Sequence, residues 1–421
     1  MVGIPFLSVM GLAAAGTVLI AVLIALTMLP ALLGFAGARA GKRRKPLPAT
    51  TMGARWAGLV TGHPVVAIGA VILILGLIAI PLKNLRLALP DAGTKAKNTT
   101  ERKAYDLLSA GFGPGFNGPL TIVVDATGQK QPQQVHAGVA KALGTFPDVA
   151  AVAPPVVNPS GDVSIISVTP RSGPASEATK SLVRLIRTRA RAAARQYAIT
   201  GYVTGTTAIN IDTSDKLSSA LPVFLILVVG LALLLLAVVF RSILVPIKAV
   251  AGFLLTIASA LGITTFIFQE GHLRGLFGVE STSPIISFLP VLMIAILFGL
   301  AMDYEVFLVS RMRESYVRTG DALGSTVAGF RASARVVTAA GIIMICVFGS
   351  FIFGGEIVIK SIGLALAFGV LADAFLVRMT LVPAVLALLG KRAWALPHWL
   401  DRLMPNLDIE GEQLLHRLES D

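Results

Sequence analysis

Seven long apolar runs constrain this chain more than any other feature of its sequence. A helix needs about 20 mostly apolar residues to cross the hydrocarbon core of a bilayer. Runs of this kind lie at roughly 4–36, 64–84, 219–240, 243–268, 285–310, 334–354 and 358–389. With 55% hydrophobic and 14% charged residues, the chain of 421 residues is too apolar for a soluble protein. The sequence therefore predicts an α-helical polytopic membrane bundle with about seven transmembrane helices.

The apolar runs and the polar stretches between them define the expected segments of the chain. A long polar insert separates the second run from the third. The expected segments are a first transmembrane helix (1–37), a basic linker (38–63), a second transmembrane helix (64–86), the insert (87–217), a five-helix membrane bundle (218–390) and a tail (391–421).

Lysine and arginine cluster beside the apolar runs, and their positions predict an orientation. The basic segments are the linker 38–63, the turn with Arg241 and Lys248, segment 311–335 and the tail 391–421. The positive-inside rule places all four in the cytoplasm and the insert outside the plasma (inner) membrane. This orientation accounts for the net charge of +13 without nucleic acid as a partner. It also implies an N-terminus outside the cell.

The insert 87–217 has the pattern of a soluble α+β domain. Strands are expected at 119–126, 149–157, 163–170 and 198–205, and helices at 132–145 and 176–196. The order β-α-β-β-α-β is that of the split βαβ, or ferredoxin-like, fold. We therefore expect one ferredoxin-like extracytoplasmic domain beside the membrane bundle.

The first and last membrane helices share a sequence pattern. Segments 8–37 and 361–390 align without a gap, and both contain Thr-x-x-Pro-Ala before a basic stretch. The matched pairs include Gly16 with Gly369, Thr27 with Thr380 and Pro30 with Pro383. Such a repeat suggests a duplicated transporter, although small apolar residues also produce chance similarity in membrane helices. In the first copy, Ile20 and Ala25 stand at the positions of Asp373 and Arg378, so these charges belong to the second copy alone.

Ionisable residues interrupt two of the apolar runs. Asp303, Tyr304 and Glu305 lie in the fifth run, and Asp373 and Arg378 lie in the seventh. Ionisable groups inside a membrane are costly and commonly mark ion pathways. A carboxyl group removed from water favours its protonated form and can release the proton when water or a cation approaches. We therefore interpret Asp303, Tyr304, Asp373 and Arg378 as a proton relay.

Alternative interpretations of these residues remain open at this stage. Asp303 could be an ordinary residue near the cytoplasmic end of its helix. Asp373 and Arg378 could form a purely structural charge set. Glu305 is interpreted as structural or interfacial, and it is expected to matter less than Asp303. Arg378 follows Asp373 by five residues, about 140° around an α-helix, so we expect it to pair outside its own helix.

Two glycines are expected to give the relay its protein surroundings. Gly299 lies one turn before Asp303, and Gly369 lies one turn before Asp373. Small residues at such positions let a neighbouring helix approach closely, so the two acids would face protein rather than lipid.

The sequence contains no pattern of an enzyme or a metalloprotein. Its five histidines have no metal-ligand spacing, and no phosphate-binding GxxxxGK[ST] loop occurs. We expect no cofactor and no metal site. An ion gradient is therefore the expected energy source for any transport.

Four separated motifs resemble the MmpL family of transporters, which belongs to the RND superfamily. They are FGLAMDYEVFLVSRMRE (298–314), DAFLVRMTLVPA (373–384), GFGPGFNGPL (111–120) and VTGTTAINIDTSDKL (203–217). The resemblance implies an RND-type bundle with porter-like outer domains that exports lipids or other hydrophobic compounds to the cell envelope by proton antiport. It also implies that Asp303 and Tyr304 match one of two Asp-Tyr pairs, and that Asp373 and Arg378 match charged positions on the last helix.

The resemblance further implies that this chain corresponds to the second half of such a transporter. Its first helix would match the sixth helix of the family. The expected partners are membrane lipids, a lipid or hydrophobic substrate, and either the missing N-terminal half or further copies of this chain. A non-transporting remnant or membrane scaffold is the alternative function. The residues alone leave sodium coupling open beside proton coupling.

Overall fold

The computed structural model describes residues 5–36 and 52–396. Parts of two expected segments, the linker 38–63 and the tail 391–421, lie outside the described residues. Within them, seven helices are long and apolar enough to cross a membrane: Gly11–Phe35, Pro64–Asn84, Thr206–Phe240, Leu244–Gln269, Leu289–Thr319, Ala322–Phe353 and Ile357–Trp394. These helices confirm the expected polytopic membrane protein.

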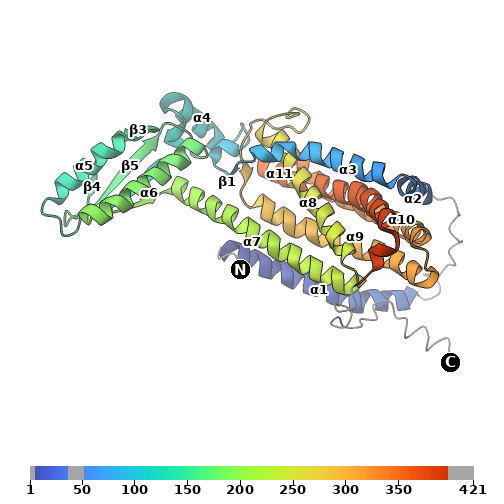
Figure 1. Cartoon of the computed structure of the whole chain (residues 1–421). Helices are drawn as coiled ribbons and strands as arrows, with labels where there is room; N and C mark the ends of the chain where they lie inside the picture. Colours follow the sequence, from blue (N-terminus) through green and yellow to red (C-terminus); the bar gives the residue numbers. More distant parts are fainter. Residues whose placement is uncertain (1–4, 37–51, 397–421) are drawn as a thin grey trace.

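Six of these helices form one bundle, at the right of Figure 1. Its elements are α3 (Pro64–Ala79), α7 (Thr206–Phe240), α8 (Leu244–Thr264), α9 (Leu289–Thr319), α10 (Ala322–Ser350), α11 (Ile357–Leu371) and α12 (Val382–Leu389). Short helical segments extend some of them: η2 (Ile80–Asn84), η5 (Thr265–Gln269), η6 (Phe351–Phe353), η7 (Ala372–Leu381) and η8 (Gly390–Trp394). The segments η5 and η7 are π-helices, and η7 joins α11 to α12.

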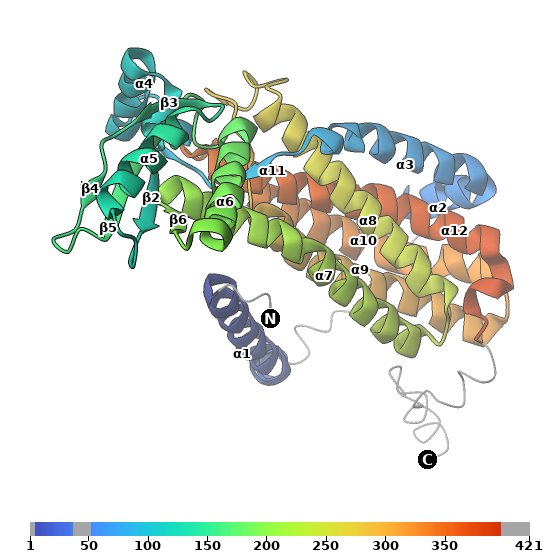
Figure 2. The same cartoon turned by 60° about the vertical axis from the view of Figure 1, so that its left-hand side comes forward.

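Helix α1 (Pro5–Ala36) differs from the rest of the membrane region. It is a continuous α-helix, although Pro30 lies inside it. Its apolar span Gly11–Phe35 has no buried residue in the described structure. Figure 2 shows α1 standing apart from the other helices. The described residues therefore leave α1 without the packing that surrounds the other spans.

The short helix α2 (Met52–Gly62) lies within the segment expected as a linker. It ends just before His63, and Pro64 begins α3, where a proline needs no N–H partner. Ala57 and Val60 are its buried residues, and the helix packs on α10 and α12. The expected linker thus contains an ordered helix attached to the bundle.

The insert forms an α+β domain at the left of Figure 1. Its elements are η3 (Ala92–Thr94), α4 (Thr100–Phe112), η4 (Pro114–Asn117), β2 (Leu120–Asp125), α5 (Pro132–Gly144), β3 (Val149–Val152), β4 (Val156–Val157), β5 (Val163–Pro170), α6 (Glu177–Tyr197) and β6 (Thr200–Thr204). The sheet order is β3-β5-β2-β6 with antiparallel pairs, and β4 also pairs with β5. Alternate residues of β2 are buried, and Leu120, Ile122 and Val124 pack in one core with residues of α6.

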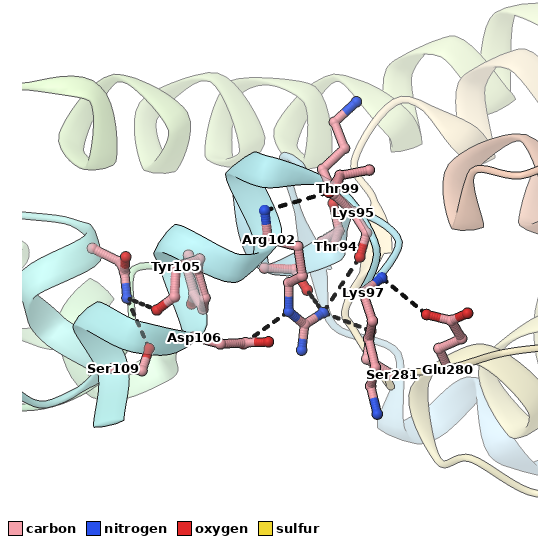
Figure 3. A network of polar contacts seen from close by, with 12 residues as sticks. Thr94, Lys95, Lys97, Thr99, Arg102, Tyr105, Asp106, Ser109, Glu280 and Ser281 are labelled. Carbon is pink, nitrogen blue, oxygen red and sulfur yellow. Dashed lines mark hydrogen bonds and ion pairs between the residues drawn. The ribbon is translucent and has the colours of Figure 1, made fainter. Parts of the chain in front are cut away.

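Three connections join this domain to the bundle. Helix α7 runs from the domain into the membrane region without a break (Figure 1). Strand β1 (Leu87–Ala88) pairs in parallel with β7 (Ile285–Ile286), just before α9. The third connection is the polar network of Figure 3, in which the Arg102 guanidinium donates to the Gly93 carbonyl and, over 3.1 Å, to Ser281 Oγ. The domain is therefore tied to one end of the bundle, at several membrane helices.

Candidate functional site

Four ionisable side chains meet inside the bundle, between α8, α9 and η7. They are Lys248 from α8, Glu305 from α9, and Asp373 and Arg378 from η7. Glu305 and Arg378 are 0% exposed, Asp373 is 4% exposed and Lys248 is 8% exposed. We call this set the charge network.

The charges in this network alternate in sign. Lys248 Nζ lies 2.6 Å from Glu305 Oε1, and the Arg378 guanidinium donates through Nη1 to the other oxygen, Oε2, of Glu305. Arg378 Nε lies 3.2 Å from both carboxylate oxygens of Asp373. With all four groups ionised, two positive charges face two negative charges. This balance lets the groups remain in an apolar bundle, because each buried charge has an opposite charge as partner.

The pairing of Arg378 with Asp373 corrects the expectation from the sequence. That expectation assumed an α-helix, in which five residues correspond to about 140°. Segment η7 is instead a π-helix, whose hydrogen bonds join residues five apart, as from Val382 N to Val377 O. A spacing of five residues therefore brings Arg378 and Asp373 to the same side. The expectation that Arg378 pairs outside its own helix is correct only for its contact with Glu305.

The sequence interpretation missed two members of the network. The sequence groups Lys248 with Arg241 in a basic cytoplasmic turn, but Lys248 is buried on α8. The sequence indicates a structural or interfacial Glu305, yet this residue joins Lys248 to Arg378. A signal existed for Lys248, a single charge flanked by apolar residues in LVPIKAVAGF, whereas Glu305 stands beside Asp303 in MDYEVFLV, where the sequence does not show which acid is buried.

Asp303 and Tyr304 occupy a different place from the network. Asp303 is exposed on the described chain, and Tyr304 is partly buried. Because Asp303 and Glu305 are two residues apart on α9, they point about 200° away from each other. No hydrogen bond or ion pair joins Asp303 or Tyr304 to the network among the described residues. Tyr304 lies between Asp303 and Glu305 in the sequence of α9. Its side chain therefore projects between the open face of the helix, which carries Asp303, and the buried face, which carries Glu305.

The two glycines also differ in their surroundings. A Cβ at Gly369 would collide with the side chain of Leu297 on α9, so helices α11 and α9 approach closely there. At Gly299, no atom of the described chain, apart from the adjoining residues and the nearby backbone of α9 itself, comes within 4 Å of the position that a Cβ would take. The face of α9 that carries Gly299 and Asp303 is therefore open, and the close neighbour expected there is not among the described residues.

A cavity of about 260 Å³ lies at the junction of the α+β domain and the bundle. Its polar lining includes Asp91, Arg102, Tyr105 and Ser281. Burial raises the pKa of Asp91, although the Gly93 N–H donates to its carboxylate and opposes that change. Arg102 donates to Asp106 and Ser281, as Figure 3 shows, and also to the carbonyl of Gly93. Arg102 therefore helps to hold the junction together through its bond to Ser281.

Comparison with known proteins agrees with this architecture. The model of the MMPL family matches residues 1–67 and 96–405. Membrane protein YdfJ of Bacillus subtilis is 50% identical over 421 residues, which cover 99% of this chain and 58% of YdfJ. The mycolic acid-containing lipids exporter MmpL11 of Mycolicibacterium smegmatis is 33% identical over 97% of this chain and 44% of its own length. The trehalose monomycolate exporter MmpL3 of Mycobacterium tuberculosis is 31% identical over 82% of this chain and 37% of its own length. The chain thus spans about half the length of the relatives that it matches most fully.

Proposed function

Since this chain belongs to the MMPL family, we propose that it forms one half of a proton-motive-force-driven exporter of lipids or other hydrophobic compounds. A transport role, rather than an enzymatic one, fits this family. The printed names of two relatives, exporters of mycolic acid-containing lipids and of trehalose monomycolate, support a lipid substrate. The observation that carries the proposal is the charge network, because buried and paired ionisable groups within membrane helices are a typical element of proton pathways.

The proposed relay uses both sides of α9. Asp303 takes up a proton on the open face, and Tyr304 connects that face with the buried side. Asp373 and Arg378 respond within the network. Protonation of a network carboxylate would leave Arg378 without its full countercharge, so α8, α9 and η7 would have to shift to restore the balance. A change of protonation would thereby become a movement of helices.

We further propose that the outer domain is ferredoxin-like and extracytoplasmic. The antiparallel order β3-β5-β2-β6, with one helix between β2 and β3 and another between β5 and β6, supports the ferredoxin-like assignment. The basic residues at 311–335 support a cytoplasmic position for the opposite end of the bundle, in a plasma membrane.

A half that corresponds to the N-terminal part of the relatives is the proposed partner, and further copies of this chain are the alternative. The exposed span of α1, the open face around Gly299 and the coverage of only 58% of YdfJ support this proposal. A non-transporting remnant or a membrane scaffold is the alternative function.

The test is proton-driven export by the two halves reconstituted together in liposomes. We expect export with both halves under a pH gradient, and its loss in Asp303→Asn with membrane insertion unchanged. Glu314→Gln is the matched control, because Glu314 pairs with Arg311 and Arg318 at the other end of α9. Normal export by Asp303→Asn would refute the relay. Export driven by a sodium gradient alone would show that the coupling ion is sodium and not the proton. An absence of export with both halves present would favour the scaffold function.

A further inference from the structure

The indole of Trp56 makes an unusual contact with the helix that carries part of the charge network. Its Nε1 donates a hydrogen bond of 3.0 Å to the main-chain carbonyl of Met379. Trp56 lies on α2, far from Met379 in sequence, and 44% of it is exposed. Met379 directly follows Arg378 in η7. A tryptophan outside the bundle therefore touches the backbone beside the arginine at the centre of the network.

The sequence leaves this carbonyl few main-chain donors. In an α-helix, the carbonyl of Met379 would accept a hydrogen bond from the amide of residue 383, which is Pro383 and has no N–H. In the π-helical register of η7, the donor would be the amide of Ala384, five residues on. A carbonyl that lacks a donor is costly in a membrane, where water cannot replace the lost partner. The indole N–H of Trp56 supplies a donor to this carbonyl from outside the helix.

Helix α2 is held firmly enough to keep Trp56 in place. Ala57 is 0% exposed and Val60 is 1% exposed. A Cβ at Gly53 would lie 3.1 Å from the Cβ of Ala334, so α2 sits directly against α10. The side chain of Met379 is also held by α10, since Thr338 Oγ1 lies 3.5 Å from its Sδ. Helix α2, which carries Trp56, and the side chain of Met379 therefore both contact α10.

We propose that Trp56 is a positioning residue for the charge network. Its hydrogen bond holds the end of η7 in the register that lets Arg378 face Asp373 and Glu305. When α2 moves away, the Met379 carbonyl loses its donor and the π-helical turn relaxes. The short helix before α3 thereby controls the geometry of the network from outside the bundle.

The decisive measurement is amide hydrogen exchange over residues 372–384 in the full chain, purified in detergent. Trp56→Phe keeps an aromatic ring but removes the N–H, and we expect exchange in this segment to become roughly fivefold faster. Trp394→Phe is the matched control, because Trp394 stacks on Tyr316 with ring centroids 5.6 Å apart. That control should leave the segment unchanged. Unaltered exchange in Trp56→Phe would overturn the proposal.

A rescue experiment separates the hydrogen bond from a general loss of packing. Pro383→Ala restores an N–H four residues after Met379, so it can replace the indole as donor. We expect Trp56→Phe to have a much smaller effect on exchange in the Pro383→Ala background than in the wild type. An equal effect in both backgrounds would show that the N–H is not what matters, and the proposal would fail.

The link to transport rests on the proposed function and has its own readout. In the two-half exporter, Trp56→Phe should displace the pH profile of export, and Trp394→Phe should not. An unchanged profile, in an exporter that works, would contradict a role of Trp56 in the relay. If the wild type does not export at all, the proposed function fails, while the exchange experiment still decides whether Trp56 holds η7.

Discussion

The two membrane helices that share a sequence pattern have different structures. Residues 8–36 lie in α1, a plain α-helix whose apolar span is fully exposed on the described chain. Segment 361–390 forms most of α11, all of η7 and α12, and its middle is buried and π-helical. Even a matched side chain differs: Thr27 Oγ1 donates to the carbonyl of Leu23, four residues earlier, but Thr380 Oγ1 donates to that of Phe375, five residues earlier.

The difference shows that an apolar pattern does not determine whether a membrane segment is α-helical or π-helical, or whether it is buried. Length and hydropathy are enough to make both segments membrane helices. The π-helical turn occurs only in the copy with Asp373 and Arg378, where it brings the two charges together. The charged copy is also the one enclosed by α8 and α9. We infer that the ion pairs, together with the helices that supply their partners, distinguish the second copy from the first.

Removing one charge from the network should cause the largest loss of stability, because the ion pairs are what distinguish the second copy from the first. Glu305→Gln leaves Lys248 and Arg378 without their shared carboxylate, and breaking a buried pair costs about 3–5 kcal/mol. Thermal unfolding in detergent should show this loss. Glu314→Gln removes an exposed acid from the same helix and should cost less than about 1 kcal/mol. Equal stability of both variants would mean that the network does not hold the second copy together.

Replacing the whole network by apolar residues should cost less than breaking it. Asp373→Ile and Arg378→Ala install the residues of α1, and Lys248→Met with Glu305→Met removes their partners. Because apolar replacement of buried ion pairs is often close to neutral, we expect stability within about 2 kcal/mol of wild type. Export by the two-half system should be lost. Full export by this quadruple variant would make the network purely structural.

The matched glycines provide a smaller test. Gly369→Ala should cost about 2 kcal/mol, because its Cβ would collide with Leu297 and force that side chain to move. Gly16→Ala has no atom within 4 Å of the new Cβ, and alanine favours helix, so stability should stay equal or rise slightly. The melting temperatures of the two variants, each compared with wild type, measure these effects. A similar loss at Gly16 would reveal a close neighbour of α1.

The matched threonines should give the smallest effects. Thr380→Val removes a hydrogen bond within η7, and we expect a loss of about 1 kcal/mol. Thr27→Val should change stability by less than half of that, since a regular α-helix needs no side-chain donor there. Thermal unfolding of both variants under the same conditions measures the two losses of stability. Equal effects would show that the π-helical turn gains nothing from Thr380.

The local patterns of the sequence determined much of this architecture. Runs of apolar residues predicted the seven spans, and alternation predicted the strands of the outer domain, because both depend on the surroundings of each segment alone. The same patterns identified Asp373 and Arg378 as charges that a membrane helix would not carry without a reason. They also placed Gly369 next to a close neighbour.

Only the tertiary structure decided which charges meet. Glu305 and Lys248 lie on different helices, so neither spacing nor hydropathy could show that they share an ion pair. Likewise, only the structure shows that η7 is π-helical and that it packs against α8, α9 and α2. The physical reason is that a buried charge is stabilised by what surrounds it in space, and in this bundle the partners of Arg378 include a residue 73 positions away along the chain.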